Sequence, residues 1–166
     1  QVWVGDITYL PKSNGGWYYL STWQDMFTCE IVGWKVSETL EADFVIESLQ
    51  KAIEKSVTSA GMIIHSDGGG QYKSIEFRQL LKSSGFRQSM TRKDNHYDNA
   101  KAESLFSRLK AEMLCDLKFK TLEEAELMVF EYVEYYNNVR LHSSLGYKTP
   151  KEFCQHFEDA GNNPKK

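Results

Sequence analysis

Three carboxylates occupy positions at which acidic side chains could act together. Asp6 lies on an otherwise apolar face of the strand-like segment 2–9, where a charge is costly unless it is paired or metal-bound. Asp67 directly follows the apolar run 62–64, and Glu103 stands near the start of a helical segment, with 35 residues between these two acids. Grouped carboxylates supply the oxygen ligands that hard divalent ions such as Mg²⁺ prefer. The three acids are therefore candidate metal ligands.

Each of these acids also has a structural interpretation. Asp6 could be a strand-end acid, and Asp67 could simply form the turn that leads into the glycines at 68–70. Glu103 could stabilise the positive end of its helix. The glycines do not form a nucleotide-triphosphate loop, because no Gly-Lys-Ser/Thr follows them.

The composition is that of one globular domain. The chain has 166 residues, of which 41% are hydrophobic and 26% charged, and this size suffices for one core. No apolar run approaches the roughly 20 residues of a membrane helix, and no signal peptide opens the chain. Its three cysteines are odd in number and far apart, which argues against a disulfide framework and favours a reducing compartment. Cys154 and His156 lack zinc-finger spacing.

The net charge is −3, but its distribution along the chain is uneven. Residues 73–120 carry 11 basic and 6 acidic side chains, whereas residues 1–72 carry 4 basic and 9 acidic ones. A local basic patch can bind phosphates whatever the overall sign of the charge. Chance clustering on a solvated surface is the alternative interpretation.

Hydrophobic periodicity predicts the elements that position the acids. β-branched and aromatic residues, with turn chemistry at 11–16, indicate an antiparallel meander of three strands. Short apolar runs then alternate with segments of helical spacing. The expected elements are strands at 2–9, 17–23 and 30–36, a helix at 45–53, a strand at 62–64, a helix at 77–81, a strand at 86–90, and helices at 102–113, 121–136 and from 150.

This order of elements predicts an α/β fold. A three-strand meander followed by crossover helices gives a mixed five-stranded sheet, with antiparallel and parallel strands, flanked by helices. We expect one catalytic domain over residues 1–157. Residues 158–166 are polar and include Gly, Asn and Pro, so we expect a disordered tail there.

Several blocks of residues occur along the chain in the order of a known family. They are Gly5-Asp6-Ile7-Thr8-Tyr9; His65-Ser66-Asp67 with Gly69, Gln71 and Tyr72; Ser89-Met90-Thr91-Arg92-Lys93; Tyr97-Asp98-Asn99-Ala100; Glu103-Ser104 with Leu109-Lys110 and Glu112; and Tyr136-Asn137, Arg140, His142, Leu145-Gly146-Tyr147 and Pro150. With these blocks the chain resembles the catalytic core of insertion-sequence transposases of the retroviral-integrase-like group, the DDE integrase core. Asp94 departs from the pattern, because the family usually has Gly there.

The resemblance implies a ribonuclease H-like fold and a Mg²⁺-dependent polynucleotidyl transferase, with Mn²⁺ as a substitute. Asp6 would bridge two ions, Asp67 would hold one and Glu103 the other, which suits the two-ion chemistry of phosphodiester cleavage. Water would first release a 3′-hydroxyl at a transposon end, and that hydroxyl would then attack a second DNA strand. The alternatives are a ribonuclease H-like hydrolytic nuclease and a degenerate, non-catalytic DNA-binding or assembly module.

The same resemblance suggests further roles. Lys110, Arg92 and Lys93 would contact DNA, although each could also be a solvated charge. The supporting residues would be His65, which could instead be a packed neutral histidine, Asn99, which could cap its helix, and Arg140 and His142, which could fix the C-terminal helices. The expected partners are DNA, as transposon ends and target, and further copies of the chain. The expected location is the bacterial cytoplasm, at the nucleoid.

Overall fold

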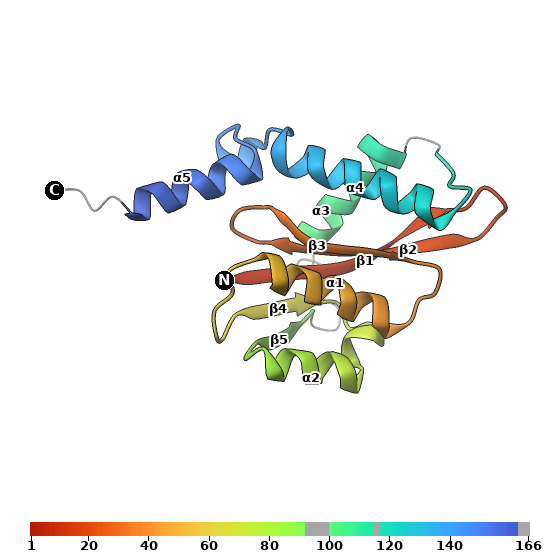
Figure 1. Ribbon diagram of the computed structural model, residues 1–166, viewed down its shortest axis with the longest axis horizontal. Coiled ribbons are helices and arrows are strands. Elements are labelled where there is room, and N and C mark those ends of the chain that lie inside the picture. Colours follow the sequence, from red (N-terminus) through yellow and green to blue (C-terminus); the bar gives the residue numbers. More distant parts are fainter. Residues whose placement is uncertain (92–99, 115–116, 163–166) are drawn as a thin grey trace.

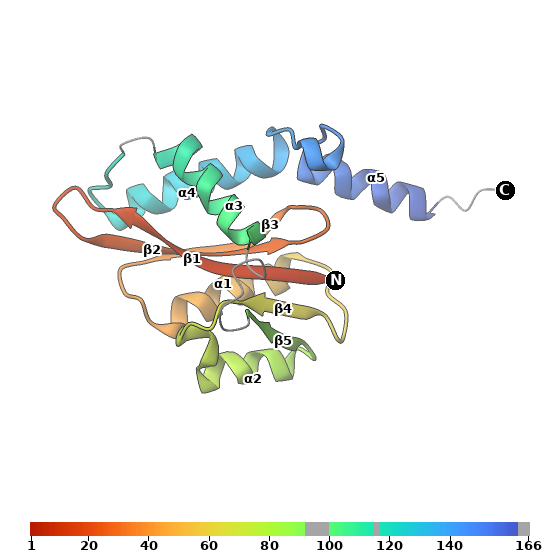
Figure 2. The ribbon, with the colours of Figure 1, turned by 180° about the vertical axis from the view of Figure 1, so that it is seen from behind.

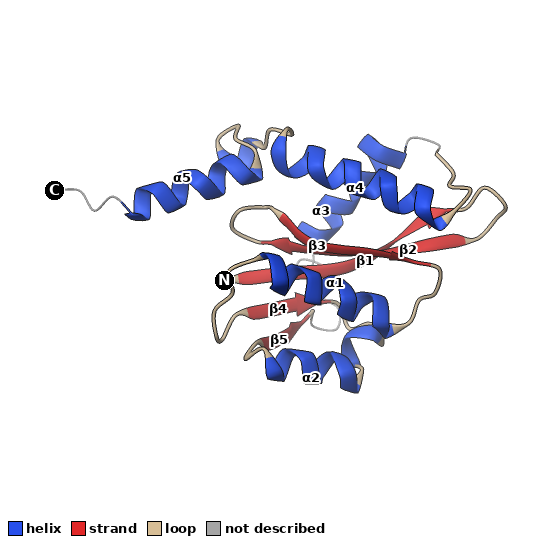
Figure 3. Ribbon diagram, viewed as in Figure 1, coloured by secondary structure: helices blue, strands red, loops and turns tan. Residues whose placement is uncertain are grey.

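The computed structural model describes residues 1–91, 100–114 and 117–162, and of residues 100–103 and 158–162 it describes the backbone alone. Helices cover both faces of a five-stranded sheet (Figures 1 and 3). Short 3₁₀ turns at Gln71–Lys73 and Ser143–Leu145 complete the described elements. The strands and helices are β1 (Val2–Pro11), β2 (Trp17–Asp25), β3 (Ile31–Ser37), α1 (Ala42–Lys55), β4 (Ile63–Ser66), α2 (Ile75–Ser83), β5 (Arg87–Met90), α3 (Ala100–Leu109), a π-helical turn (Lys110–Leu114), α4 (Leu122–Asn138) and α5 (Pro150–Asn162).

The sheet has the strand order β3-β2-β1-β4-β5. The first three strands pair antiparallel as a meander, and β4 pairs parallel with both β1 and β5. Helices α1 and α2 make the crossovers that parallel pairing requires. The α/β fold with a mixed five-stranded sheet that the sequence predicts is thereby confirmed.

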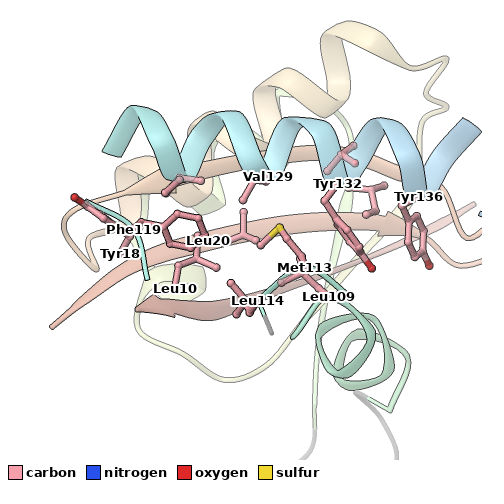
Figure 4. Packing of buried hydrophobic residues seen from close by; sticks show 14 of the residues in the cluster. Leu10, Tyr18, Leu20, Leu109, Met113, Leu114, Phe119, Val129, Tyr132 and Tyr136 are labelled. Carbon is pink, nitrogen blue, oxygen red and sulfur yellow. The ribbon is translucent and has the colours of Figure 1, made fainter. Parts of the chain in front are cut away.

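Two hydrophobic cores lie on opposite faces of the sheet. Helices α1 and α2 cover the face that carries Trp3 and Trp23. Helices α3 and α4 cover the other face, where Leu10, Leu20 and Leu109 pack together (Figure 4). Burial of apolar area contributes roughly 25 cal/mol per Å², so each helix is held mainly by its apolar stripe. The sheet is thus fixed from both sides.

Close contact between Gly5 and the Trp23 ring fixes the centre of the sheet. A Cβ atom at Gly5 would lie within 2.3–2.5 Å of three Trp23 ring atoms, so only glycine fits here. The same indole stacks on Phe77 of α2, and its Nε1 donates to Ser48 Oγ of α1 at 2.9 Å. One side chain therefore joins two strands and two helices.

Two local signals of the sequence are confirmed. Thr121 Oγ1 accepts from Glu124 N at 3.2 Å, as the predicted capping box at the start of α4 requires. Gly85 follows α2 with φ of 70°, and Phe86 N donates to Leu81 O at 2.8 Å. The helix thus ends with a residue in the left-handed backbone conformation, which favours glycine.

The structure differs from the sequence prediction at one helix. The helix expected to run unbroken to residue 113 ends at Leu109 and continues as the π-helical turn. Met113 and Leu114 of this turn are both buried in the core. Helix α5 spans Pro150–Asn162, and the division at 157 into a core and a disordered tail stays a prediction.

Among the described residues, no helix combines the length and apolar character needed to cross a bilayer. Helix α5 extends away from the rest of the molecule, towards the C-terminus (Figures 1 and 2). Phe153 and Phe157 on this helix pack edge-on against Phe27, with ring centroids 5.4 and 5.0 Å from it.

The Gly5 contact predicts a large effect of a small substitution. We expect Gly5→Ala to lower the free energy of unfolding by about 1–3 kcal/mol, because the added methyl group displaces the Trp23 ring. Urea denaturation measures this. The control is Gly70→Ala, since Gly70 has helical φ and ψ and nothing within 4 Å of its missing Cβ, so its stability should change by less than about 1 kcal/mol. Equal effects of both substitutions would contradict the assignment.

Candidate active site

The sheet register relates Asp6 to Asp67. Parallel pairing joins Val2 to Ile63 and Val4 to His65, an offset of 61 residues. Strand β4 ends at Ser66, and the same offset continued by two positions would set Asp6 opposite Asp67. The carboxyl ends of parallel strands are where sheets of this kind form sites. Two acids that are distant in the sequence are therefore candidates for one site.

Local hydrogen bonds orient both carboxylates. Asp6 Oδ1 accepts from Ile7 N at 2.8 Å, and Asp67 Oδ1 accepts from Gly69 N at 2.9 Å. The second bond closes the turn that the glycines after Asp67 permit, and both acids remain partly exposed. The two side chains are therefore oriented by the backbone before any ligand arrives.

Helix α3 carries the third acid to the same side of the sheet. Its residues Leu105 and Leu109 pack in the core cluster with Leu10 of β1, and α3 contacts β1 directly (Figure 2). Leu10 and Asp6 share a face of β1 by strand alternation. Glu103 stands in the first turn of α3, where the structure describes only its backbone.

Tyr72 is buried beside the acids. Its hydroxyl has no hydrogen-bond partner among the described residues, and the residue is 1% exposed. Burial, and then the negative charges of Asp6 and Asp67, raise the pKa of Tyr72 well above its usual range. The hydroxyl therefore keeps its proton and is a hydrogen-bond donor.

His65 lies on β4 two residues before Asp67. Its Nδ1 is 2.9 Å from Ser89 Oγ and its Nε2 is 3.4 Å from Thr91 Oγ1, so hydroxyls face both ring nitrogens. His65 also lines an open groove of about 500 Å³ on this face with Val4 and neighbouring residues. The imidazole thus links β4 to the end of β5, close to the acids.

The predicted DNA-contacting residues lie only partly within the described structure. Lys110 is exposed and begins the π-helical turn, directly after the helix that carries Glu103. Arg92, Lys93 and Asn99 lie outside the described residues. Their assigned roles stay predictions.

Arg140 is engaged in an ion pair. Its Nη2 and Nε lie 2.7 and 2.9 Å from Glu112 Oε1, and Tyr132 donates to the same carboxylate at 3.3 Å. These bonds, led by that of Arg140, lower the pKa of Glu112. Arg140 therefore connects the C-terminal segment to the π-helical turn. Its partner in that turn, Glu112, lies nine positions after Glu103.

His142 and its neighbours form a buried polar cluster. The His142 ring lies edge-on to Tyr136 with centroids 4.7 Å apart, and Tyr136 Oη accepts from Gln24 Nε2 at 2.9 Å. Asn137 Nδ2 and Oδ1 bond the carbonyl and the amide of Ile31 at 3.0 and 2.9 Å. These contacts fasten α4 to the strands β2 and β3.

Among the described side chains, no three histidine, cysteine, aspartate or glutamate residues are grouped so that they could hold a metal ion. The side chain of Glu103, the expected third ligand, is not in that set. Of the three expected ligands, the structure describes the side chains of Asp6 and Asp67.

Two residues near the acids received no role from the sequence. Tyr72 belongs to a matched motif, but only its burial reveals an unsatisfied hydroxyl. Lys73 places its ammonium 3.4 Å from where a Cβ on Gly68 would lie, next to Asp67. The sequence signal that could have singled out Lys73 is its position at the start of the basic segment 73–120.

Comparison with known proteins identifies the family. Two family models, each described as an integrase core domain, match residues 1–96 and 84–150. The transposase of insertion sequence IS904 from Lactococcus lactis is 42% identical over 154 residues, covering 92% of this chain. The chain belongs to the integrase core domain family. The family resemblance read from the sequence is confirmed.

This integrase core spans little more than half the length of its relatives. It covers 60% of the IS904 transposase and 53% of transposase InsF of IS3A from Escherichia coli, to which it is 38% identical over 154 residues.

Solved structures support the ribonuclease H-like fold. The BIV integrase catalytic core aligns with a TM-score of 0.72 and 18% identity, covering 98% of both chains. The HTLV-2 integrase catalytic core, in complex with magnesium, aligns with a TM-score of 0.70 over 92% of this chain and 95% of the viral one, also at 18% identity. At this identity the likeness concerns the fold alone.

Burial of His142 predicts a pH-dependent stability. Desolvation, followed by the charges of Arg140 and Arg108, lowers the pKa of His142 from 6.5 to about 4. The folded state binds this proton less readily than the unfolded chain, so stability is lost as pH falls from about 6.5 to 4. Urea unfolding at pH 7, 6 and 5 measures the slope. His142→Gln should make it shallower by up to about 1.4 kcal/mol per pH unit; an identical slope would contradict this.

Proposed function

We propose that this integrase core is the catalytic domain of a transposase, a polynucleotidyl transferase that cleaves DNA at transposon ends and joins them to a target. The observation that supports the proposal is the parallel register of β1 with β4, which, continued by two positions, would set Asp6 opposite Asp67. Helix α3 extends over the same face and carries Glu103 in its first turn. The family supports transposition as the general process.

The residues present suit divalent magnesium, with manganese as a substitute. Asp6 and Asp67 offer carboxylate oxygens, the donors that Mg²⁺ prefers, and their backbone bonds already orient them. Asp6, Asp67 and Glu103 would hold the ions. When bound, such ions stabilise charge on the attacking and leaving oxygens of a phosphodiester. His65 and the turn after Asp67 keep this edge of the sheet ordered.

DNA is the proposed substrate, and the basic segment is its proposed contact. Lys110 projects into solvent two turns after Glu103, so a strand lying across the acids would meet its ammonium group. Arg92, Lys93 and Asn99 belong to the segment between β5 and α3, where we keep their predicted roles. Joining two ends requires more than one active site, which favours a homo-oligomer on DNA in the bacterial nucleoid.

Removing single carboxylates tests the site. We expect Asp67→Asn and Glu103→Gln each to reduce cleavage and joining at least about 100-fold. Thermal melting in chelator should be unchanged or higher, because repulsion between carboxylates is relieved. One labelled duplex with an uncut end reports cleavage, and a second with a free 3′-hydroxyl reports joining to a circular target. Both are assayed in Mn²⁺, with melting curves recorded in parallel.

The matched control is Glu47→Gln, which removes an exposed carboxylate on α1, across the sheet from α3. It should leave cleavage and joining unchanged. Cleaved DNA without joined product would indicate a hydrolytic nuclease instead. A large loss of stability in Glu103→Gln would make that residue structural.

Lys110 gives a second test. We expect Lys110→Ala to weaken DNA binding and to reduce the slope of log affinity against log salt by about 1. Lys82→Ala, an exposed substitution on α2 across the sheet from α3, should leave the slope unchanged. Fluorescence anisotropy at several salt concentrations measures both slopes, and an unaltered slope for Lys110→Ala would remove it from the DNA path.

A further inference from the structure

The Tyr72 hydroxyl is a buried polar group for which the described part of the chain supplies no partner. The residue is 1% exposed, so bulk solvent does not reach the hydroxyl. An unsatisfied buried hydroxyl lowers stability, and a phenylalanine would fill the same space without that loss. The presence of the Tyr72 hydroxyl in a well-packed core therefore suggests a function for it.

The ring that carries this hydroxyl is held firmly in place. It meets Trp23 and Phe77 edge-on, with centroids 6.0 and 5.6 Å away and interplanar angles of 87° and 80°. Gln88 Nε2 donates to the Tyr72 carbonyl at 2.6 Å and fixes the backbone. The hydroxyl is thus held in the interior.

The same ring lies beside the turn that presents Asp67. A Cβ atom at Gly69 would be 3.0 Å from Asp67 Oδ1 and 3.5 Å from Tyr72 Cδ2, so the carboxylate and the ring flank one point of the backbone. The negative charges of Asp6 and Asp67 also contribute to the raised pKa of the Tyr72 hydroxyl. A rigid donor therefore belongs to the ring that flanks the Asp67 turn.

We propose that Tyr72 is a positioning residue whose hydroxyl donates to the Asp6–Asp67 carboxylate pair, directly or through one ordered water, when a divalent cation is bound. This inference rests on the proposed function, because it requires a cation between those acids. Ligating carboxylates are commonly held by such hydrogen bonds, which fix their orientation. The cation draws the two repelling carboxylates together, and the preplaced donor then gains its partner.

The test is Tyr72→Phe in the 166-residue chain, with Mn²⁺ as the probe. In chelator, the melting temperature should be unchanged or higher, because an unsatisfied hydroxyl is removed. In calorimetric titration, the Mn²⁺ affinity should fall about five-fold, the effect expected for one hydrogen bond. A purely structural hydroxyl would not produce these opposite changes.

Two companion variants separate the explanations. Tyr136→Phe removes a buried hydroxyl that is bonded to Gln24, so it should lower the melting temperature and leave Mn²⁺ affinity unchanged. Asp67→Asn should abolish Mn²⁺ binding. If it does so while Tyr72→Phe binds Mn²⁺ like the wild type, the inference on Tyr72 is overturned and the proposed function stands. If the wild type binds no Mn²⁺, alone or with a DNA duplex, or if Asp67→Asn changes nothing, both are overturned.

Discussion

Contact of the Trp23 indole with the bare backbone of Gly5 is the constraint on which the rest of the structure depends. A side chain at Gly5 would separate the two strands' packing surfaces, because the ring occupies the place of its Cβ. The indole also contacts Phe77 and Tyr72 and donates to Ser48. Interiors packed at crystal-like density do not absorb a shift at such a point. The neighbour of Gly5 is Asp6, so the packing of this core also sets the position of the first acid.

The strand register and the backbone, rather than any contact between the two side chains, determine the positions of Asp6 and Asp67. The register of β1 with β4, continued by two positions, would set Asp6 opposite Asp67, and backbone amides orient both carboxylates. A cation that both carboxylates bind would stabilise the folded chain. The Tyr72 hydroxyl, which has no partner among the described residues, lowers stability near the same turn.

Residues of the last matching block, among them Asn137 and Arg140, hold the C-terminal part of the chain against the sheet and the π-helical turn. Asn137 bonds both backbone groups of Ile31 at the start of the edge strand β3. Arg140 bonds Glu112 in the π-helical turn that continues from α3. Both contacts hold α4 against the elements that carry the core, and the second anchors the helix of Glu103 at its far end. Residues remote from the acids therefore determine how firmly α3 is seated.

The sequence by itself determined the elements, the mixed sheet and the family, because these depend on short-range rules. Hydrophobic periods of two and of 3.6 residues act within one strand or one helix. The cap at Thr121 and the left-handed backbone conformation of Gly85 act within one turn. The acids could be singled out because a charge on an apolar strand face is conspicuous locally. Their roles as metal ligands remain predictions.

Only the tertiary structure decided which residues meet across the chain. The Trp23 contact with Gly5, the pair of Arg140 with Glu112 and the bonds of Asn137 to Ile31 join segments 18 to 106 positions apart. The π-helical turn and the unpartnered hydroxyl of Tyr72 likewise result from packing. No periodicity along the chain encodes such contacts, because they follow from how whole faces of the elements fit together.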